Sequence, residues 1–494
     1  MRRYLLPAVV LAVVVAASIL TSRANDAAEP DTPADTTADP LTTPLFSARR
    51  APEWLRQPTN DNILRDGVEA AMSELPDIAP ACVSVHRGGE SIAEVNSDLS
   101  FIPGDLQRLT TLAAMQTVGS GGFTTAVVRD INDPIEEGVL QGNLYIIGGA
   151  DPVLSTGPFI SRFPEGTAST SLVELAVDTV EQLRADGISE IAGGIVGVDL
   201  KYAGNVQSNT NEDAELFVWT EPDIGSNAVG ITDGLLVDNG FQSFDADLVD
   251  PSARVRAASA ETHVAGELRG MIQFGGIMVT GEATVGEAPE AAARESVAEI
   301  DSPPLQDIAQ RALTDATTAE MLFRELALRD VGEAHPLAAT FKVLEVLQTS
   351  ELMDVDELGN TANWDGSGLS DLDRGTCRLF ADILDRGVSL PVEAITGVGA
   401  GAAAACAPTT LESLDVIASA RPSVTSAAGR VMAANGDLIT FAVIVNWIPD
   451  AETGELAPRG VCDDVVPAVL DAIAAHPGGP DIDDLTPLPV VTNS

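Results

Sequence analysis

The stretch FIPGDLQRLTTLAAM, residues 101–115, decides the fold of this chain. It passes from an extended Phe-Ile-Pro segment into a helix whose apolar positions Leu109, Leu112 and Ala113 have helical spacing. A strand-to-helix corner of this kind places free backbone N–H groups and the positive end of the helix dipole where negative charge develops on a nucleophile. Asp105 and Arg108 lie at the corner, so they are the first candidates for a functional role.

Asp105 and Arg108 also have a purely structural interpretation. Asp105 can cap the helix, which contributes about 1 kcal/mol, and can pair with Arg108 at i,i+3 spacing, which contributes a few tenths of a kcal/mol. Because this interpretation explains both residues without any chemistry, the sequence favours it over a catalytic role.

Composition excludes some classes of function. The 494 residues are 45% hydrophobic, enough for a large core divided over two or three domains. Lys and Arg total 27 against 74 Asp and Glu, a formal net charge of -47 that repels phosphate backbones and anionic lipids. Nucleic acid is therefore excluded as a partner. Only two lysines occur, Lys201 and Lys342.

The N-terminal residues 1–24 have the features of an export signal. Arg2 and Arg3 precede an apolar run from Tyr4 to Leu20, and a small-x-small cleavage pattern follows. The rival interpretation is an uncleaved membrane anchor, because 17 apolar residues lie at the lower edge of a membrane span. Residues 25–52 form an acidic Pro/Thr-rich linker and 479–494 a polar tail, both expected to be disordered. The protein is thus expected outside the cytoplasm, in the cell envelope.

Export permits disulfide bonds, and the cysteines allow three pairings. Cys377 and Cys406 are nearest in the chain, so a structural bridge between them is favoured, with buried free thiols as the alternative. No Cys or His cluster has the spacing of a metal site, so neither a metal nor another cofactor is expected.

Several stretches together resemble the class C low-molecular-mass penicillin-binding proteins. They follow in the same order along the chain: FIPGDLQRLTTLAAM, GNLYIIGGADPVL, SPPLQDIAQRALTDATTAEMLFREL, WDGSGLSDLDRGTCRLFADIL and TSAAGRVMAANGDLITFAVIVN. This family comprises D-alanyl-D-alanine carboxypeptidases and endopeptidases, which trim peptidoglycan stem peptides. The resemblance implies an α/β (α+β) fold: a serine β-lactamase/transpeptidase-like domain over 53–155 and 300–478, with a β-rich domain inserted at 156–299.

Such a family uses three motifs, and this sequence departs from all of them. Judged by its flanking residues, the Ser and Lys of the first motif correspond to Asp105 and Arg108. The Ser-x-Asn of the second corresponds to Thr314-Asp315-Ala316, and the Lys-Thr-Gly of the third to Ile417-Ala418-Ser419. Thr317 and Glu320 fit a capping box, which favours a helix-entry role for Thr314 and Asp315.

The lysine positions show the departure without any alignment. No Ser precedes Lys201 or Lys342 by three residues, and neither lysine is followed by Thr-Gly or Ser-Gly. Arg108 cannot act as a base, because its guanidinium stays protonated, and Asp105 could attack a carbonyl only through a labile anhydride. In the Gly-rich loop DGSGLS, Ser367 and Ser370 are expected to line the cleft and to stabilise its turns.

Two functional hypotheses follow. The first is a non-catalytic relative that binds peptidoglycan or a partner in the cell-wall machinery, contacting a membrane only through the N-terminal segment. The second is an active serine-type D-Ala-D-Ala carboxypeptidase with displaced groups, in which Thr314, Ser367 or Ser419 is the nucleophile and Arg421 binds the carboxylate. The missing lysines favour the first.

Overall fold

The corner at residues 101–115 folds as a 3-10 turn, η3 (Gly104–Leu106), followed directly by helix α3 (Gln107–Val118). The computed structural model describes residues 53–75, 79–119, 121–202, 219, 228–243, 254–332, 334–353, 357–387, 414–421, 423–432, 437–448 and 465–476. The chain turns at Gly104, whose φ of 58° lies in the left-handed region that glycine adopts without strain. The predicted helix cap at Asp105 is wrong. Asp105 lies inside the 3-10 turn, and the N-cap residue of α3 is Leu106, without a side-chain hydrogen bond.

A five-stranded antiparallel sheet joins the two ends of the described chain. Its order is β16 (Leu414–Arg421), β17 (Val424–Met432), β18 (Leu438–Asn446), β1 (Ala81–Arg87) and β2 (Glu90–Val95). The turn between β1 and β2 contains Gly88 and Gly89, both with positive φ as a tight hairpin requires. The pairing of β1 with β18 therefore brings residues near 85 beside residues near 441.

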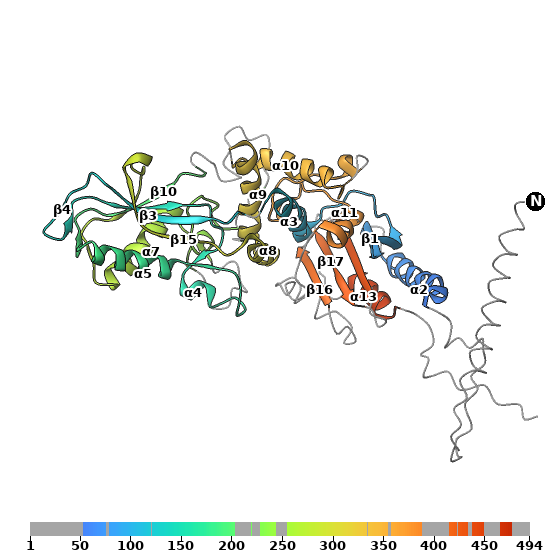
Figure 1. Cartoon of the computed structure of the whole chain (residues 1–494). Coiled ribbons are helices and arrows are strands. Elements are labelled where there is room, and N and C mark those ends of the chain that lie inside the picture. Colours follow the sequence, from blue (N-terminus) through green and yellow to red (C-terminus); the bar gives the residue numbers. More distant parts are fainter. Residues whose placement is uncertain are drawn as a thin grey trace, which may run out of the picture. The chain divides into compact units, whose positions relative to one another are not determined.

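Helices cover both faces of this sheet (Figure 1). Side chains alternate along β18: Phe441 and Val443 pack on one face, and Ala442 and Ile444 on the other. The first face carries α2 (Glu53–Ser73) and α13 (Val465–Ala474). The second carries α3 with α8 (Leu305–Thr314), α9 (Ala316–Val331), α10 (Pro336–Thr349) and α11 (Cys377–Asp382).

A second five-stranded sheet is built from the middle of the chain. Its order is β14 (Ala283–Val285), β10 (Ile195–Asp199), β6 (Leu144–Gly148), β3 (Thr124–Asp130) and β15 (Arg294–Asp301). Helices α5 (Leu172–Ala185) and α7 (Ala260–Phe274) pack on it. The sequence assigned 124–155 to the other domain, but β3 and β6 pair with strands of this sheet. An apolar run such as LYIIG predicts a buried strand without identifying the sheet that buries it.

Shorter elements connect these layers. They are β4 (Ile135–Glu136), β5 (Val139–Leu140), β7 (Leu154–Ser155), α4 (Gly157–Ile160), β8 (Thr170–Ser171), β9 (Glu190–Ile191), η4 (Asp238–Gly240), β11 (Phe241–Ser243), β12 (Val255–Arg256), β13 (Met278–Val279), η6 (Ala291–Ala293), η7 (Glu357–Asn360) and the π-helical turn η8 (Ile383–Gly387). Among the helices that the structure describes, none is both long and apolar enough to cross a membrane. The segments 1–24, 25–52 and 479–494 lie outside the described residues.

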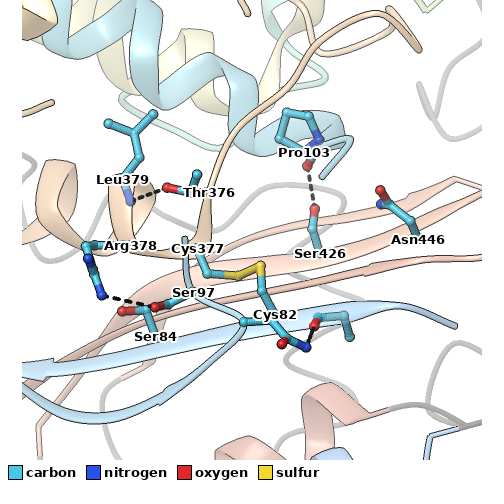
Figure 2. The surroundings of a disulfide bond; sticks show 12 residues. Cys82, Ser84, Ser97, Pro103, Thr376, Cys377, Arg378, Leu379, Ser426 and Asn446 are labelled. Carbon is cyan, nitrogen blue, oxygen red and sulfur yellow. Dashed lines mark hydrogen bonds between the residues drawn. A yellow bond between two sulfur atoms is a disulfide. The ribbon is translucent and has the colours of Figure 1, made fainter. Parts of the chain in front are cut away.

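A disulfide bond links the sheet to the helical layer above it. It joins Cys82 of β1 to Cys377 at the start of α11, as Figure 2 shows. The predicted pairing of Cys377 with Cys406 is therefore wrong, and Cys406 lies outside the described residues. Proximity along the chain was a poor guide because the pairing of β1 with β18 brings the N-terminal strand under α11.

We expect removal of this disulfide to destabilise the protein by about 2 to 4 kcal/mol, because it closes a long loop in the unfolded chain. The variant Cys82→Ala with Cys377→Ala, compared with the wild type by urea denaturation, measures the loss. An unreduced digest should contain one peptide pair that carries Cys82 and Cys377. Two free thiols at these positions, or a peptide pair that joins Cys377 to Cys406, would contradict the assignment.

Candidate functional site

Arg108, on the first turn of α3, makes three hydrogen bonds with three different segments. Its Nη2 donates to Asp105 Oδ1 at 2.9 Å, which confirms the predicted i,i+3 ion pair. Its Nε donates to the carbonyl of Ser367 and its Nη1 to that of Leu313, both at 2.9 Å. Arg108 is only 7% exposed, so these three contacts hold its guanidinium in a buried position.

The loop that contains DGSGLS packs directly against the corner. Gly368 has a φ of 83°, and a Cβ built on it would lie 2.3 Å from the carbonyl oxygen of Gly104. On the other side of the loop, a Cβ on Gly366 would lie 2.4 Å from that of Phe323 in α9. Only glycine fits at either position, so the loop is wedged between η3 and α9.

Asp365, fully buried at the start of this loop, accepts hydrogen bonds that shape it. Its carboxylate accepts from the backbone N–H groups of Gly368 at 2.7 Å and Ser370 at 2.9 Å, and from the hydroxyl of Ser367 at 3.0 Å. The indole Nε1 of Trp219 donates to the same carboxylate. Asp365 therefore joins the loop to a residue nearly 150 positions earlier in the chain.

Asp373 is a second buried carboxyl group beside Asp365. It accepts the backbone N–H of Trp364 at 2.6 Å. Burial, followed by the negative charge of Asp365, raises the pKa of Asp373 well above its ordinary value. Both burial and the proximity of a second carboxyl group thus favour the neutral form of Asp373.

Ser367 and Ser370 have structural roles and do not line a cleft. Both side chains are completely buried. Ser367 Oγ accepts from the backbone N–H of Leu369 at 3.2 Å, and Ser370 Oγ accepts from that of Leu372 at 3.1 Å. The predicted role in turn geometry is confirmed. The predicted cleft-lining position is wrong, because neither side chain is exposed to solvent.

Asp315, at the position of the second motif, caps α9. Its Oδ1 accepts the backbone N–H groups of Thr317 at 3.0 Å and Thr318 at 3.1 Å. Burial acts to raise its pKa, but Arg311, the amide of Asn239 and the Thr318 N–H outweigh burial, so the pKa lies below its ordinary value. Asp315 is therefore ionised and occupied with structural donors, as the helix-entry interpretation predicts.

The capping box predicted at Thr317 and Glu320 does not form. Thr317 Oγ1 accepts the backbone N–H of Gly230 at 2.9 Å. Glu320, fully buried, instead accepts the Gly366 N–H at 2.9 Å and the Nε of Arg324 at 3.0 Å. Burial raises the pKa of Glu320 to about 7, against the influence of Arg324. Thr317 and Glu320 thus connect α9 to the segments that contain Gly230 and Gly366. These contacts join distant parts of the sequence, so the local pattern could not predict them.

Ala316, the last residue assigned to the second motif from the sequence, is covered by apolar side chains. It is 7% exposed and packs in a cluster with Trp219 and Val229, against which Trp364 and Leu369 also pack. An alanine methyl offers no hydrogen bond, and the surrounding indole rings occupy the space beside it. The neighbouring Thr314 donates its hydroxyl to the carbonyl of Arg311 at 3.1 Å.

The strand that corresponds to the third motif lies at the edge of its sheet. Ser419 of β16 pairs in register with Ser426 of β17. The hydroxyl of Ser426 donates to the carbonyl of Pro103 at 2.7 Å, immediately before η3 (Figure 2). The edge position agrees with the expectation for a peptide-binding strand, but neither lysine of the chain lies on β16. The structure therefore places β16 beside η3.

The comparison with protein families identifies this arrangement. The model of the D-Ala-D-Ala carboxypeptidase 3 (S13) family matches residues 64–241 and 243–395, more than half of the chain. The chain belongs to this family. Membership in the D-Ala-D-Ala carboxypeptidase 3 (S13) family confirms the resemblance to low-molecular-mass penicillin-binding proteins and makes this chain a carboxypeptidase-like protein of the cell wall. No curated protein matches the sequence.

Solved structures share the fold. Penicillin binding protein 4 (dacB) from Haemophilus influenzae matches with a TM-score of 0.60 and 18% identity, over 82% of this chain and 98% of that one. The same protein complexed with a β-lactam matches with a TM-score of 0.56, 18% identity and the same coverage. The expected transpeptidase-like fold is therefore confirmed.

Two residues that shape the site were missed by sequence reasoning. Trp219 stands in no recognisable motif, and its contact with Asp365 spans 146 residues, so no sequence signal could have found it. Asp365 was visible as the first residue of DGSGLS, and a carboxylate before a Gly-rich turn is a common acceptor of turn N–H groups. In the part of the chain that the structure describes, no group of His, Cys, Asp and Glu is arranged to hold a metal.

Proposed function

We propose that this protein is a non-catalytic member of the D-Ala-D-Ala carboxypeptidase 3 (S13) family that acts by binding within the cell-wall machinery. The observation that carries the proposal is the position of Arg108. Judged by its flanking residues, the family's base corresponds to Arg108, whose permanently charged guanidinium is bonded to Asp105 and to the carbonyls of Ser367 and Leu313. The guanidinium cannot accept a proton from a nucleophile.

The surroundings of Ala316 support binding to a partner rather than to a stem peptide in the ancestral cleft. The substrate amide would need a side-chain amide at this position, and Ala316 supplies none. The cluster of Trp219 and Val229 also covers it. A peptide that entered here would have to displace packed apolar side chains without gaining hydrogen bonds in return.

The alternative hypothesis of displaced catalytic groups gains no support from the described residues. Ser367 is completely buried and donates to Asp365, while the hydroxyl of Thr314 donates to a carbonyl. Ser367 has a carboxylate beside it, but its complete burial keeps a substrate from reaching the hydroxyl. The partner of the Thr314 hydroxyl is a backbone carbonyl, which is not a base. The side chains of Ser419 and Arg421 lie outside the described residues.

We also propose that the protein is exported through its N-terminal residues 1–24. Two arginines followed by an apolar run and a small-x-small pattern support an export signal. The family acts on the cell wall, which supports the same location.

We expect the purified protein to form no covalent adduct with a fluorescent penicillin and to release no D-alanine from a pentapeptide stem, because a Ser–Lys pair is missing. Labelling on denaturing gels and a D-alanine assay measure the two outcomes. Penicillin binding protein 4 from Haemophilus influenzae serves as the positive control in the labelling assay. A labelled band or D-alanine release that disappears in a single Ser or Thr variant would contradict the proposal.

A further inference from the structure

A solvent-facing groove lies between α5 and α7, which pack side by side on the second sheet (Figure 1). It has a volume of about 740 Å³. Its lining comes from these two helices: Val173, Ala176, Val177, Val180, Glu181, Arg184, Gly266, Glu267, Gly270, Met271, Phe274 and Gly275. The groove belongs to a different sheet and a different set of helices from the site described above.

Large apolar side chains at this groove are in water. Phe274 is 96% exposed, and Val177 is 50% exposed. Exposure of an apolar side chain to water raises the free energy of the unbound protein. Burial of that side chain against a partner would remove this cost. Single exposed apolar residues are ordinary, but here several line one hollow.

The floor of the groove on α7 is formed by glycines. Gly266 and Gly270 stand one turn apart on the exposed side of the helix. A Cβ built on Gly270 would meet nothing within 4 Å. Glycine inside a helix destabilises it relative to alanine, and no contact within the protein requires it at Gly270. A missing side chain at this point lets another backbone approach α7 closely.

The polar rim of the groove is acidic. Glu181 of α5 is exposed at the groove, and Glu267 lines it from α7. The basic residue of the lining, Arg184, donates to the carbonyl of Gly275. The chain as a whole carries a formal charge of -47, so a second copy of it would be repelled. The charge of the rim complements a positively charged partner.

We propose that this groove binds an amphipathic helix of a partner protein, with an apolar face flanked by Lys or Arg. Helices α5 and α7 form the two sides of an apolar groove, and a partner helix can pack over the groove between them. The acidic side chains at the rim then pair with the basic residues that flank the apolar face of the partner helix. This inference rests on the proposed function, because it names a partner for a protein that acts by binding. The residues of the groove are different from those of the candidate functional site.

The test uses a fluorescein-labelled 18-residue helical peptide of Leu and Lys, titrated with the full chain by fluorescence anisotropy. Gly270→Trp fills the groove and should weaken binding at least tenfold. Leu337→Trp, on an exposed position of α10, is the matched control and should bind as the wild type does. Gly270→Ala should raise Tm by about 1 to 2 °C, because alanine is the better helix former, which shows that the position tolerates a side chain.

The contribution of charge is tested by reversing it. Glu181→Lys with Glu267→Lys should transfer the preference to a matched peptide of Leu and Glu. Glu74→Lys with Glu136→Lys makes the same change in net charge at residues outside the groove lining and should leave the preference for the Leu/Lys peptide unchanged. If both double variants behave alike, the peptide responds only to net charge and the groove proposal is wrong.

Three further results would overturn the proposal: no saturable binding by the wild type, equal binding by Gly270→Trp, or self-association of the protein alone that Gly270→Trp abolishes. The last result would assign the groove to a second copy. Penicillin labelling is measured on the same preparation. A labelled protein that still binds the peptide contradicts only the proposed function, whereas an unlabelled protein that does not bind it contradicts only the groove.

Discussion

The substitution Asp365→Asn is expected to lower the free energy of unfolding by about 3 to 5 kcal/mol, since it leaves buried donors without a charged acceptor. The carboxylate of Asp365 accepts from two backbone N–H groups, a serine hydroxyl and the indole of Trp219. An asparagine supplies one oxygen, and its amide group would point hydrogens at donors. Urea denaturation followed by circular dichroism measures the loss.

The matched control for this experiment is Asp373→Asn. The pKa of Asp373 is raised by burial and by the charge of Asp365, which favours the neutral acid that asparagine resembles in shape. Its oxygen can still accept the Trp364 N–H, and its amide can donate to Asp365. We expect a change below about 1 kcal/mol. Equal losses in the two variants would show that the negative charge does not reside on Asp365.

Restoring the first motif with Asp105→Ser and Arg108→Lys is expected to give no measurable release of D-alanine. The double variant regains a hydroxyl and an amine. It still lacks the side-chain amide at Ala316 and a lysine on β16, and catalytic groups that act as a unit lose most of their activity when one is missing. A D-alanine assay with a pentapeptide stem, run beside the wild type, measures the outcome. Turnover at the level of an active family member would show that the remaining motifs survive elsewhere in the chain.

The same double variant should be less stable by about 2 to 4 kcal/mol. A lysine ammonium is a point donor on a flexible stem and cannot reproduce the planar geometry with which Arg108 contacts the carbonyls of Ser367 and Leu313. Arg108→Lys alone separates this loss from that of the Asp105 carboxylate. A double variant as stable as the wild type would mean that the carbonyls find other donors.

The parts of this protein that the sequence predicted correctly are those with a local signature. The corner at 101–115 carries its pattern in consecutive residues. The ion pair of Asp105 with Arg108 was predicted from its i,i+3 spacing.

The parts that the sequence could not predict depend on contacts between distant residues. Cys377 pairs with Cys82 because β1 lies next to α11 in the folded protein. Strands β3 and β6 could pair with several apolar strands, and only the folded structure shows which sheet contains them. The Trp219 indole on Asp365 is a third example. In each case the local pattern fits more than one partner, and only the tertiary fold selects between them.

The pairing of β1 with β18 has a consequence for the order in which this protein is made. Strand β1 ends at Arg87 and its neighbour β18 ends at Asn446, so at about 5 to 20 residues per second the first strand waits on the order of 20 to 70 s for its partner on the ribosome. The sheet built from β3, β6, β10, β14 and β15 has all its strands by Asp301 and can fold within that interval. During synthesis, the strand that contains Val83 and Val85 therefore remains apolar and unpaired. We expect the nascent chain, rather than the folded protein, to be the form that most needs a chaperone.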